Sequence, residues 1–556
     1  MFGRNLKTVR FGARWKSSAS NPGHVKSRSS VLGSQYVGYG LLAVTLTGLV
    51  YNEDFRARTV DSYLVAERVG VVAVATTKCF SYYLRTLNQN YDTQEEYYKA
   101  LSKTHKKAAE TTLAALRKNG GIYIKLGQHV SAMSYLLPLE WTSTMVPLQS
   151  ECPESSLEDL KQMVEHDLQV KFDEYFEEFD PKPIGVASLA QVHVATLKGS
   201  GQKVAVKLQH PSLEKFVPLD VELTALVFNS MKKVFPQYPL TWLSDELRQS
   251  IFVELDFRNE AENAQTTANY FQNYKKQTAL RIPQVYAAKR RVLVMEFLSG
   301  SRLDNLEYLD KNNISRSEVS CCLSHIFNNM IFQTGFVHCD PHHGNLAIRA
   351  LPKKKNGHNF EIILYDHGLY RRIPTQMKVD YAKFWLAMIE KKPDQMQKYG
   401  KRFSKIEDDS LYPLLAAALT GRDFEHALSG NIAIPRSEKE IEAMKNAISS
   451  DGLLLDLMAL LSSVPRIVLL ILKTNDLTRH LDEALQNPLG MERTFFIMAT
   501  YCARAVYADE TSKLRKRSPF FSLTRLVGSV TAWWNLYSRI LLLSFYDIVF
   551  YLRNMV

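Results

Sequence analysis

The stretch that decides the fold is HCDPHHGN, residues 338–345. Asp340 and Asn345 stand five positions apart, so a carboxylate and an amide can share one short turn. A general base and a metal ligand need this closeness when both act on the same reacting group. A second carboxylate, Asp366, follows the apolar run 362–365, which predicts the end of a strand, and precedes Gly368, which permits a tight bend. The pattern predicts two carboxylates that emerge from neighbouring loops.

Upstream of this stretch, residues 204–207 read VAVK, a buried strand that presents a single amine. A desolvated ammonium at Lys207 can pair with phosphates and with a helix glutamate, which Glu260 can supply 53 residues later. The order Lys207, Glu260, Asp340, Asn345, Asp366 is that of a kinase-type ATP site. Each part alone has a plainer interpretation, since VAVK fits an ordinary edge strand and Asp-x-Gly an ordinary turn.

The length and composition of the chain limit the class of protein and the kinds of partner that can be expected. The chain has 556 residues, of which 46% are hydrophobic and 23% charged, enough for two or more globular units with a sizeable core. The net charge is +12, but seven Lys and Arg residues precede the first acidic residue, which leaves about +5 elsewhere, so nucleic acid is not expected as a partner. The six cysteines show no spacing suited to zinc or to a disulfide framework.

The N-terminal region predicts targeting and anchoring. Residues 1–34 are rich in Arg, Lys and Ser and lack Asp and Glu, as a mitochondrial presequence does; a basic tail without structure is the alternative. Residues 35–52 carry no charge and predict a transmembrane helix, with a buried core helix as the alternative. If this segment spans the inner membrane, the positive side stays in the matrix, and the rest of the chain lies in the intermembrane space.

Local patterns indicate mainly helix. We expect helices over 88–118, 123–136, 151–179 and 220–271, with a β-hairpin over 183–206 turning at Gly199-Ser200-Gly201. Residues 292–295 read as a strand, and from Ser315 the pattern is mainly helical apart from the two carboxylate loops. The tail 518–556 is aromatic and apolar, which favours helices packed on the body or lying at a membrane interface; a core helix is equally compatible.

Two further motifs point to a family. Lys125-Leu126-Gly127-Gln128 fits a KxGQ pattern, and Glu254-Leu255-Asp256 fits an ExD pattern six residues before Glu260. Together with PIGVASLAQVH at 183–193 and the 338–345 loop, they make the chain resemble the UbiB family, the aarF-domain-containing atypical kinases, and its mitochondrial branch in particular. The resemblance covers roughly residues 119–372.

The resemblance implies an α+β, two-lobed, atypical protein-kinase-like fold that binds ATP and Mg²⁺. Together with the patterns at the two ends of the chain, it divides the sequence into a presequence (1–34), a transmembrane helix (35–52), a helical extension with KxGQ (53–180), an N-lobe with ExD (181–300), a largely helical C-lobe (301–517) and apolar C-terminal helices (518–556). The expected catalytic residues are Asp340, Lys207 and Glu260; the metal ligands are Asn345 and Asp366; the nucleotide contacts are Gly185, Val186, Ala187, Ser188, Lys207, Glu296 and Phe297; and the regulatory residues are Lys125, Gln128, Glu254 and Asp256.

Four positions depart from the family pattern. Gly185 and Val186 stand where many members have alanines, so nucleotide selectivity attributed to that loop does not carry over. His367 replaces the phenylalanine of the DFG motif, which removes the basis for a phenylalanine-packing switch. Cys339 stands where a glycine is common.

The expected function is that of an atypical kinase-like ATPase, or a small-molecule or lipid kinase, of the mitochondrial inner membrane. The resemblance implies a role in lipid or coenzyme Q homeostasis, with membrane lipids and a lipid or quinone-related small molecule as partners. In the family, the KxGQ segment covers the site where a protein kinase seats its peptide. The alternatives are a pseudokinase scaffold or lipid-binding module without turnover, and a lipid carrier.

Overall fold

The computed structural model describes residues 53–131, 137–149, 152–236, 240–408, 464–487, 492–517 and 522–553, with a few residues between them. The described residues from Val69 onward belong to one compact unit. The predicted presequence and the predicted membrane helix at 35–52 both lie outside the described residues. Among the helices that are described, none has both the length and the apolar character needed to cross a bilayer.

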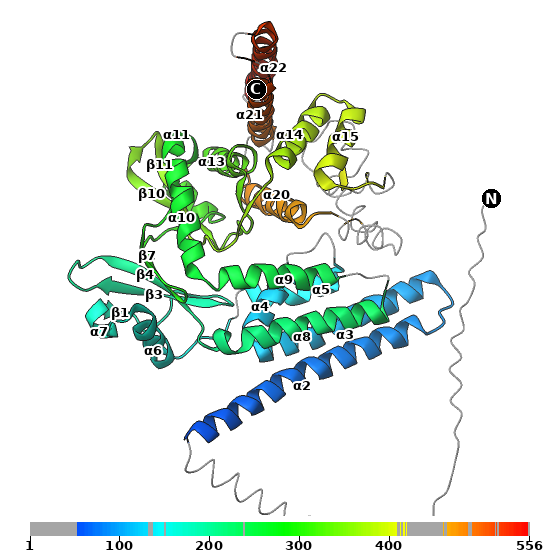
Figure 1. Cartoon of the computed structure of the whole chain (residues 1–556), viewed down its shortest axis with the longest axis vertical. Helices are drawn as coiled ribbons and strands as arrows, with labels where there is room; N and C mark the ends of the chain where they lie inside the picture. The colour runs from blue at the N-terminus through cyan, green and yellow to red at the C-terminus, as the bar shows by residue number, and fades with distance from the viewer. Residues whose placement is uncertain are drawn as a thin grey trace, which may run out of the picture. The chain divides into compact units, whose positions relative to one another are not determined.

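Helices precede the first sheet (Figure 1). They are α2 (Glu53–Leu87), α3 (Gln94–Asn119), α4 (Ile122–Ser131), α5 (Leu139–Met145) and the 3-10 helix η1 (Val146–Gln149). Helix α3 begins after Thr93, whose hydroxyl accepts a hydrogen bond from the backbone N–H of Glu96. It ends at Gly120 and Gly121, which both have positive φ and redirect the chain into α4. The helix predicted over 88–118 is confirmed from Gln94 onward, because 88–93 form the turn between α2 and α3; the helix predicted over 123–136 is confirmed to Ser131, and 132–136 lie outside the described residues.

The first sheet carries the predicted hairpin. Its strands are β1 (Phe176–Phe179), β2 (Gly185–Val186), β3 (Ala190–Leu197), β4 (Lys203–Gln209), β6 (Val285–Ala288) and β7 (Val292–Glu296). They are arranged in the order β1-β3-β4-β7-β6, with β2 paired to β3. Positive φ at Gly199 and Gly201 closes the β3–β4 turn, a conformation that glycine adopts without strain. Strand β4 is therefore central, and Lys207 is flanked by Val192 and Leu293.

Two helical predictions need correction. Residues 151–179 contain α6 (Leu157–Leu168) and α7 (Phe172–Tyr175), but 176–179 form strand β1, because pairing with β3 overrides local helix preference. The stretch 220–271 is broken into α8 (Ser212–Val234), α9 (Thr241–Glu254) and α10 (Phe257–Phe271). Asp256 causes the second break, because its side chain caps the N-terminus of α10.

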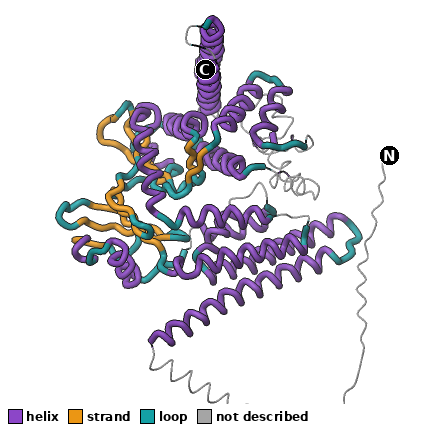
Figure 2. Tube along the Cα trace, viewed as in Figure 1, coloured by secondary structure: helices purple, strands orange, loops and turns teal. Residues whose placement is uncertain are grey.

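A second sheet follows in the C-terminal half. Its strands are β5 (Leu280–Arg281), β8 (Ser301–Arg302), β10 (Leu346–Lys355) and β11 (His358–Leu364), in the order β5-β11-β10-β8; β9 (Phe336–His338) and β12 (Tyr370–Arg372) form a separate pair. The expectation of a mainly helical pattern from Ser315 is therefore wrong for β9, β10 and β12, whereas the strand end expected before Asp366 is confirmed by β11. The β10–β11 hairpin turns at Asn356-Gly357, where both residues have positive φ. Figure 2 shows the described strands, all of which lie between Phe176 and Arg372.

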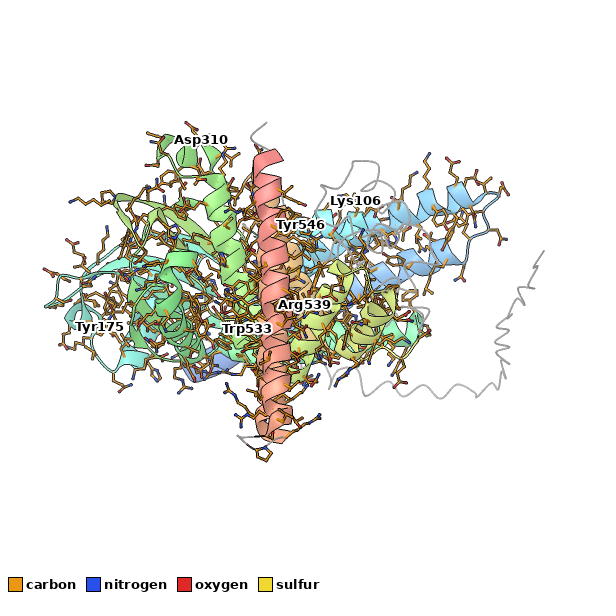
Figure 3. The ribbon with its side chains drawn as sticks, turned by 90° about the horizontal axis from the view of Figure 1, so that it is seen from above. Lys106, Tyr175, Asp310, Trp533, Arg539 and Tyr546 are labelled. Carbon is orange, nitrogen blue, oxygen red and sulfur yellow. The ribbon has the colours of Figure 1, made fainter. Side chains whose placement is uncertain are left out.

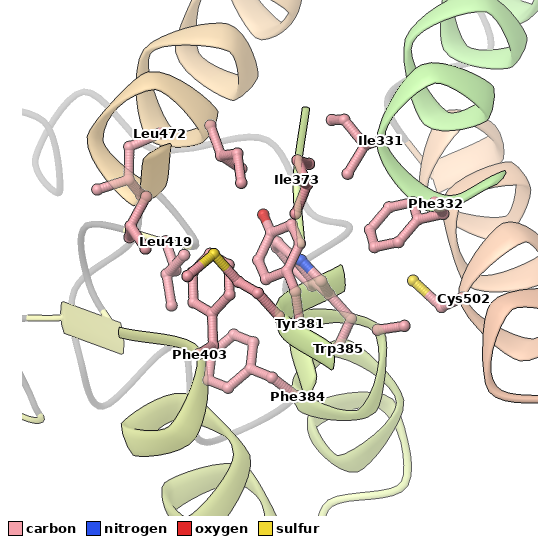
Figure 4. Close-up of a cluster of buried hydrophobic side chains, with 14 of the residues drawn as sticks. Ile331, Phe332, Ile373, Tyr381, Phe384, Trp385, Phe403, Leu419, Leu472 and Cys502 are labelled. Carbon is pink, nitrogen blue, oxygen red and sulfur yellow. The ribbon is translucent and has the colours of Figure 1, made fainter. Parts of the chain in front are cut away.

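Helices make up the remainder. They are η2 (Gln272–Tyr274), α11 (Lys275–Thr278), α12 (Leu306–Lys311), α13 (Arg316–Asn329), the π-helix η3 (Met330–Thr334), α14 (Thr375–Ile389), α15 (Pro393–Ser404), α20 (Arg466–Ala484), α21 (Glu492–Arg517) and α22 (Leu523–Arg553). A large apolar core joins η3, α14, α15, α20, α21 and α22 (Figure 4), whereas α12 and α13 pack into a second core. In the large core, the Tyr381 ring of α14 stacks on Phe403 of α15, with ring centroids 4.4 Å apart, and Leu472 of α20 packs nearby. This core holds α20 close to the 338–345 loop.

Candidate nucleotide and phosphoryl-transfer site

Lys207 joins three separate parts of the chain. Its Nζ lies 2.8 Å from Glu260 Oε1, 2.9 Å from Glu260 Oε2 and 2.7 Å from Asp366 Oδ2. Lys207 comes from the middle of β4, Glu260 from α10, and Asp366 from the loop after β11. The structure thus brings together the lysine, the helix glutamate and the second loop carboxylate that the sequence predicted would meet.

The ionisation states of Lys207, Glu260 and Asp366 depend on one another. Burial would lower the pKa of Lys207, but the carboxylates of Asp366 and Glu260 outweigh it and raise that pKa. Burial opposes ionisation of Asp366 too, yet the Lys207 ammonium and the N–H of Gly368, 2.9 Å from Oδ1, hold its pKa below the usual range. Burial raises the pKa of Glu260 to about 7 against the pull of Lys207. Asp366 is therefore the carboxylate that is fixed in the ionised form.

The 338–345 loop is tied to the Asp366 segment through His338. The backbone N–H of Asp340 donates to His338 Nδ1 at 3.0 Å, so Nε2 carries the proton and donates to the Asp366 carbonyl at 2.9 Å. Burial lowers the pKa of His338, which matches this single neutral tautomer. Asn345 Nδ2 donates to the Asp340 carbonyl at 3.0 Å, which closes the short turn predicted from the five-residue spacing. The two carboxylate loops are thus one connected structure.

His367, which stands in place of the DFG phenylalanine, is a structural polar residue. Its Nδ1 accepts from the Tyr370 hydroxyl at 3.0 Å, and its Nε2 donates to the Leu364 carbonyl at 3.2 Å. The two rings stack with an interplanar angle of 14°. Burial, with a smaller contribution from His338, lowers the pKa of His367 to about 3, so the ring is neutral. A phenylalanine would fill the space but could make neither hydrogen bond.

Lys125, the lysine of the KxGQ motif, lies near the loops that carry Asp340 and Asp366. Lys125 Nζ lies 2.7 Å from Glu254 Oε2, and both side chains are largely buried. Burial would lower the pKa of Lys125, but Glu254, Asp340 and Asp366 together raise it, so this cation lies in the field of both loop carboxylates. Gln128 donates to the Leu148 carbonyl at 2.9 Å and accepts from the Ser188 hydroxyl at 3.4 Å. Helix α4 is thereby linked to the predicted nucleotide loop.

The two carboxylates of the ExD motif, Glu254 and Asp256, have different partners. Glu254 at the end of α9 pairs with Lys125, whereas Asp256 caps α10 and holds Arg258 through an ion pair of 2.6 Å. Asp256 is therefore engaged with its own helix rather than with Lys125. Its contact to Arg258 keeps its pKa below the usual range, despite partial burial.

The predicted nucleotide loop bends between β2 and β3. Gly185 and Val186 pair with β3, and the Ala187 N–H donates to the Ala190 carbonyl at 2.8 Å. The Ala187 carbonyl accepts from His210 Nε2 at 2.9 Å, and Ser188 is buried. At Gly185 there is open space where a Cβ would lie, so the alanine common in the family would fit here.

The predicted adenine-contacting segment ends strand β7. Glu296 pairs in register with Val204 of β4, and its carboxylate accepts from Arg281 at 2.5 and 2.6 Å. The Lys203 ammonium lies 5.0 Å from the centroid of the Phe297 ring. The backbone of this segment adjoins β4, whereas the Glu296 side chain is committed to Arg281.

Two residues that the sequence did not single out complete the site. Lys473 Nζ on α20 lies 2.7 Å from Asp340 Oδ1. His129, one turn beyond Lys125 on α4, has its pKa lowered to about 3 by burial and by the nearby Lys473 and Lys125 ammonium groups. The only signal for Lys473 was one cation after the apolar run 467–472, and nothing local connected it to Asp340.

The donor set suits a divalent cation that brings its own phosphate ligands. A Cβ built on Gly368 would lie 3.3 Å from Asp366 Oδ1, 3.8 Å from Glu254 Cγ and 3.9 Å from Glu260 Oε2. Glu254 Oε1 is buried without a hydrogen-bond partner. Within the described residues no group of three or more His, Cys, Asp and Glu side chains could hold a metal alone. Mg²⁺ typically needs only one or two carboxylates when phosphates supply further oxygens.

Comparison with known proteins agrees with this geometry. Residues 147–400 match the ABC1 atypical kinase-like domain. The chain is 52% identical to "ABC1 family protein MCP2" of Saccharomyces cerevisiae over 524 residues, which cover 93% of this chain and 92% of that protein. The chain belongs to the ABC1 family. It is also 36% identical to "AarF domain-containing kinase 1" of Drosophila melanogaster, over 87% of this chain and 90% of that protein.

The ABC1 assignment confirms the predicted family and its α+β, kinase-like fold. Among solved structures, Rv3197 of Mycobacterium tuberculosis, in complex with erythromycin, matches with a TM-score of 0.39 and 20% identity over 66% of this chain and 97% of that chain. The Rio2 kinase of Chaetomium thermophilum, with ADP/Mg²⁺ and phosphoaspartate, matches with a TM-score of 0.25 and 10% identity over 65% of this chain and 94% of that chain.

Proposed function

We propose that this ABC1 protein binds ATP with Mg²⁺ and transfers the terminal phosphoryl group to a small molecule, to a lipid or to water. The observation that carries the proposal is the position of Lys207 Nζ, within 2.9 Å of both Glu260 and Asp366. A buried lysine held between a helix glutamate and a loop aspartate is the arrangement that orients nucleotide phosphates in kinases.

Each residue has a distinct role in this proposal. Lys207 binds the α- and β-phosphates, and Glu260 holds its ammonium in place. Asp366 and Asn345 are the ligands for Mg²⁺, which when bound neutralises phosphate charge. The loop from Gly185 to Ser188 lies over the phosphates, and the backbone of Glu296 and Phe297 adjoins the adenine.

Asp340 positions the attacking hydroxyl and accepts its proton. Burial opposes ionisation, but Lys473, Lys125 and His342 hold the pKa of Asp340 well below its usual range. The carboxylate is therefore an acceptor at neutral pH, and its role is mainly to orient the nucleophile, because so weak a base takes a proton late.

The Lys125–Glu254 pair favours a small substrate over a protein. Because Lys125 is largely buried and lies in the field of Asp340, helix α4 occupies the approach to that carboxylate. A peptide chain would have to displace this ion pair and leave a buried charge without its partner, which is costly. A single hydroxyl or a lipid headgroup needs less space.

A second function, a nucleotide-responsive scaffold without turnover, has one observation in its favour. Both loop carboxylates are already neutralised by lysines, Asp340 by Lys473 and Asp366 by Lys207. A state stabilised in this way could bind nucleotide and change shape without transferring phosphate. Magnesium-dependent binding with no hydrolysis, even with liposomes present, would favour this scaffold.

We place the protein in mitochondria, at the inner membrane, with a role in lipid or coenzyme Q homeostasis. The acid-free basic segment 1–34 and the uncharged segment 35–52 support this location. In intact mitochondria, protease should not reach residues 69–556, and rupture of only the outer membrane should expose them. Continued protection after rupture would contradict the intermembrane-space orientation.

The nucleotide site is tested by thermal shift with Mg²⁺ and ATP. The parent protein should be stabilised by the two together, and Asp366→Asn should lose the shift, because the metal then lacks its carboxylate. The matched control is Asp310→Asn, an exposed aspartate of α12 paired with Arg316. An unchanged shift in Asp366→Asn would contradict the metal assignment.

A further inference from the structure

Helix α22 (Leu523–Arg553) is attached to the body along one narrow face. Ala532, Leu536 and Leu543 are buried on that face, and Leu536 belongs to the large apolar core. Arg539 anchors the middle of the helix through an ion pair of 2.7 Å with Glu390. Figure 3 shows the length of the helix, with Trp533, Arg539 and Tyr546 labelled along it. The face of α22 that carries these residues therefore packs against other parts of the same chain.

The outer face is a continuous apolar stripe. Its large side chains are between 44% and 74% exposed, and they recur every three or four residues along the helix. They are Leu523, Leu526, Val527, Val530, Trp533, Trp534, Tyr537, Leu541, Leu542, Phe545, Tyr546, Ile548 and Val549. So long an exposed apolar surface is unusual on a protein that remains alone in water, and it marks an interaction site.

The charges around the stripe identify the partner. From Lys513 to Arg553 the sequence contains seven Lys and Arg residues and one acid, Asp547, although Lys513 pairs with Asp509 and Arg539 with Glu390. Asp547 lies 3.8 Å from Arg493 of α21. Three of the cations, Arg515 to Arg517, are exposed at the end of α21, directly before α22. A partner for this surface must therefore be apolar at its centre and negatively charged at its edge.

We propose that α22 docks lengthwise on an anionic lipid bilayer, with its apolar stripe in the acyl boundary and the basic residues at the headgroups. Interfacial helices have this combination of a polar flank and an apolar face. Trp533, Trp534 and Tyr537 suit the interface, because amphipathic rings gather there. The helix lies on the bilayer rather than through it, since α22 fails the requirement for a span and its opposite face is anchored to the body.

A second copy of the chain fits the stripe less well. Two copies paired in parallel through α22 would bring their basic segments together, with only Asp547 on the helix to offset the repulsion. The stripe is also broader than the two-position seam of a coiled coil, and it carries five aromatic rings. Both features favour a bilayer.

Tryptophan quenching tests the proposal on the full chain. The protein is reconstituted into phosphatidylcholine vesicles containing phosphatidylglycerol and brominated acyl chains, which quench only indoles in contact with them. The chain has six tryptophans, so Trp533→Phe/Trp534→Phe isolates the contribution of α22 from that of any other membrane contact. We expect the parent to be quenched and most of that quenching to disappear in the variant.

Two further variants define the surface. Leu541→Glu/Phe545→Glu should abolish the quenching assigned to Trp533 and Trp534, without lowering the unfolding temperature, because both side chains are exposed. The matched control is Leu226→Glu, which replaces a similarly exposed leucine on α8 and should retain the quenching of Trp533 and Trp534. Equal quenching of the parent and the Trp533→Phe/Trp534→Phe variant would overturn the proposal. The proposal would also be overturned if the tryptophan emission were unaffected by the bromolipids but changed with protein concentration, as pairing of two copies predicts.

Discussion

Lys473 Nζ lies 2.7 Å from Asp340 Oδ1, although the two residues are 133 positions apart in the chain. Neighbouring side chains fix this relationship. The Thr474 hydroxyl, which donates to the Leu470 carbonyl at 2.8 Å, also lies 3.4 Å from the His338 carbonyl, and Asn475 donates to the Tyr381 hydroxyl at 2.5 Å. Helix α20 is therefore fastened to the loop that carries Asp340, and Lys473 serves as the counter-ion of that carboxylate.

Replacing Lys473 tests this pairing. Lys473→Met leaves the largely buried Asp340 charge without its nearest partner, and we expect the free energy of unfolding to fall by about 1–3 kcal/mol. Lys473→Arg should restore most of the loss, and Lys473→Met/Asp340→Asn should recover part of it. Urea denaturation at pH 7 measures all three. If Lys473→Met unfolds at the parent's urea concentration, the lysine is not paired with Asp340 in solution.

Lys125 and Glu254 form a second buried pair with a different consequence. Lys125→Met should cost about 3–5 kcal/mol, because the Glu254 carboxylate would remain buried without a cation. Its Oε1 atom already lacks a hydrogen-bond partner, so nothing nearby can compensate. The double variant Lys125→Met/Glu254→Gln should regain much of the stability. Equal destabilisation in the single and double variants would show that the methionine itself, and not the lost pairing, is responsible.

Gly127 of the KxGQ motif is required for packing. A Cβ at this position would lie 2.1 Å from Leu148 Cδ1 and 3.1 Å from Leu116 Cδ1, in a region that is fully packed. Gly127→Ala should therefore lower the free energy of unfolding by about 1–3 kcal/mol. Gly185→Ala is the matched control, because no atom lies within 4 Å of its added Cβ. Comparable thermal unfolding of the two variants would refute the steric role.

His367 gives the stability a pH dependence. Its pKa in the folded protein is about 3, against about 6.5 in the unfolded chain, so the unfolded state binds the extra proton between these values. Stability must therefore fall as pH decreases below about 6.5. His367→Phe should reduce the slope between pH 6 and pH 5 by about 1.4 kcal/mol per pH unit.

Glu260 changes the stability in the opposite direction as pH varies. Because the parent and His367→Phe both contain Glu260, its contribution cancels when their slopes are compared. Its folded-state pKa is raised to about 7, so its contribution is present at low pH and is lost as pH rises through 7. Denaturant unfolding at several pH values measures the difference in slope. An identical slope in the parent and His367→Phe would mean that His367 is already charged in the folded protein.

The meeting of Lys207 with Asp366, and the short turn from Asp340 to Asn345, were predictable because these residues lie in short local patterns. Lys207 follows a β-branched strand, Asp366 follows an apolar run, and Asp340 and Asn345 share one turn; the structure brings Lys207 and Asp366 together and closes that turn. Lys473 was not predictable, because a lysine after an apolar helical run looks like an ordinary surface residue. Only the packing of α20 turns it toward Asp340.

The errors in the fold have equally specific causes. The β10–β11 hairpin was missed although Asn356-Gly357 is a typical turn signal, because lysines 353–355 made the strand look polar and solvent-exposed. Strand β1 was missed because Phe176–Phe179 forms a strand only by pairing with β3. Asp256 fits a family motif in sequence, yet its side chain caps α10, a role that depends on where that helix begins.

The most direct measurement is a structure of the protein with a non-hydrolysable ATP analogue and Mn²⁺ in place of Mg²⁺. We expect an anomalous signal beside the Asp366 carboxylate and Asn345, with the Lys207 ammonium on the α- and β-phosphates. Nucleotide bound elsewhere, or a metal that does not contact Asp366, would contradict this expectation.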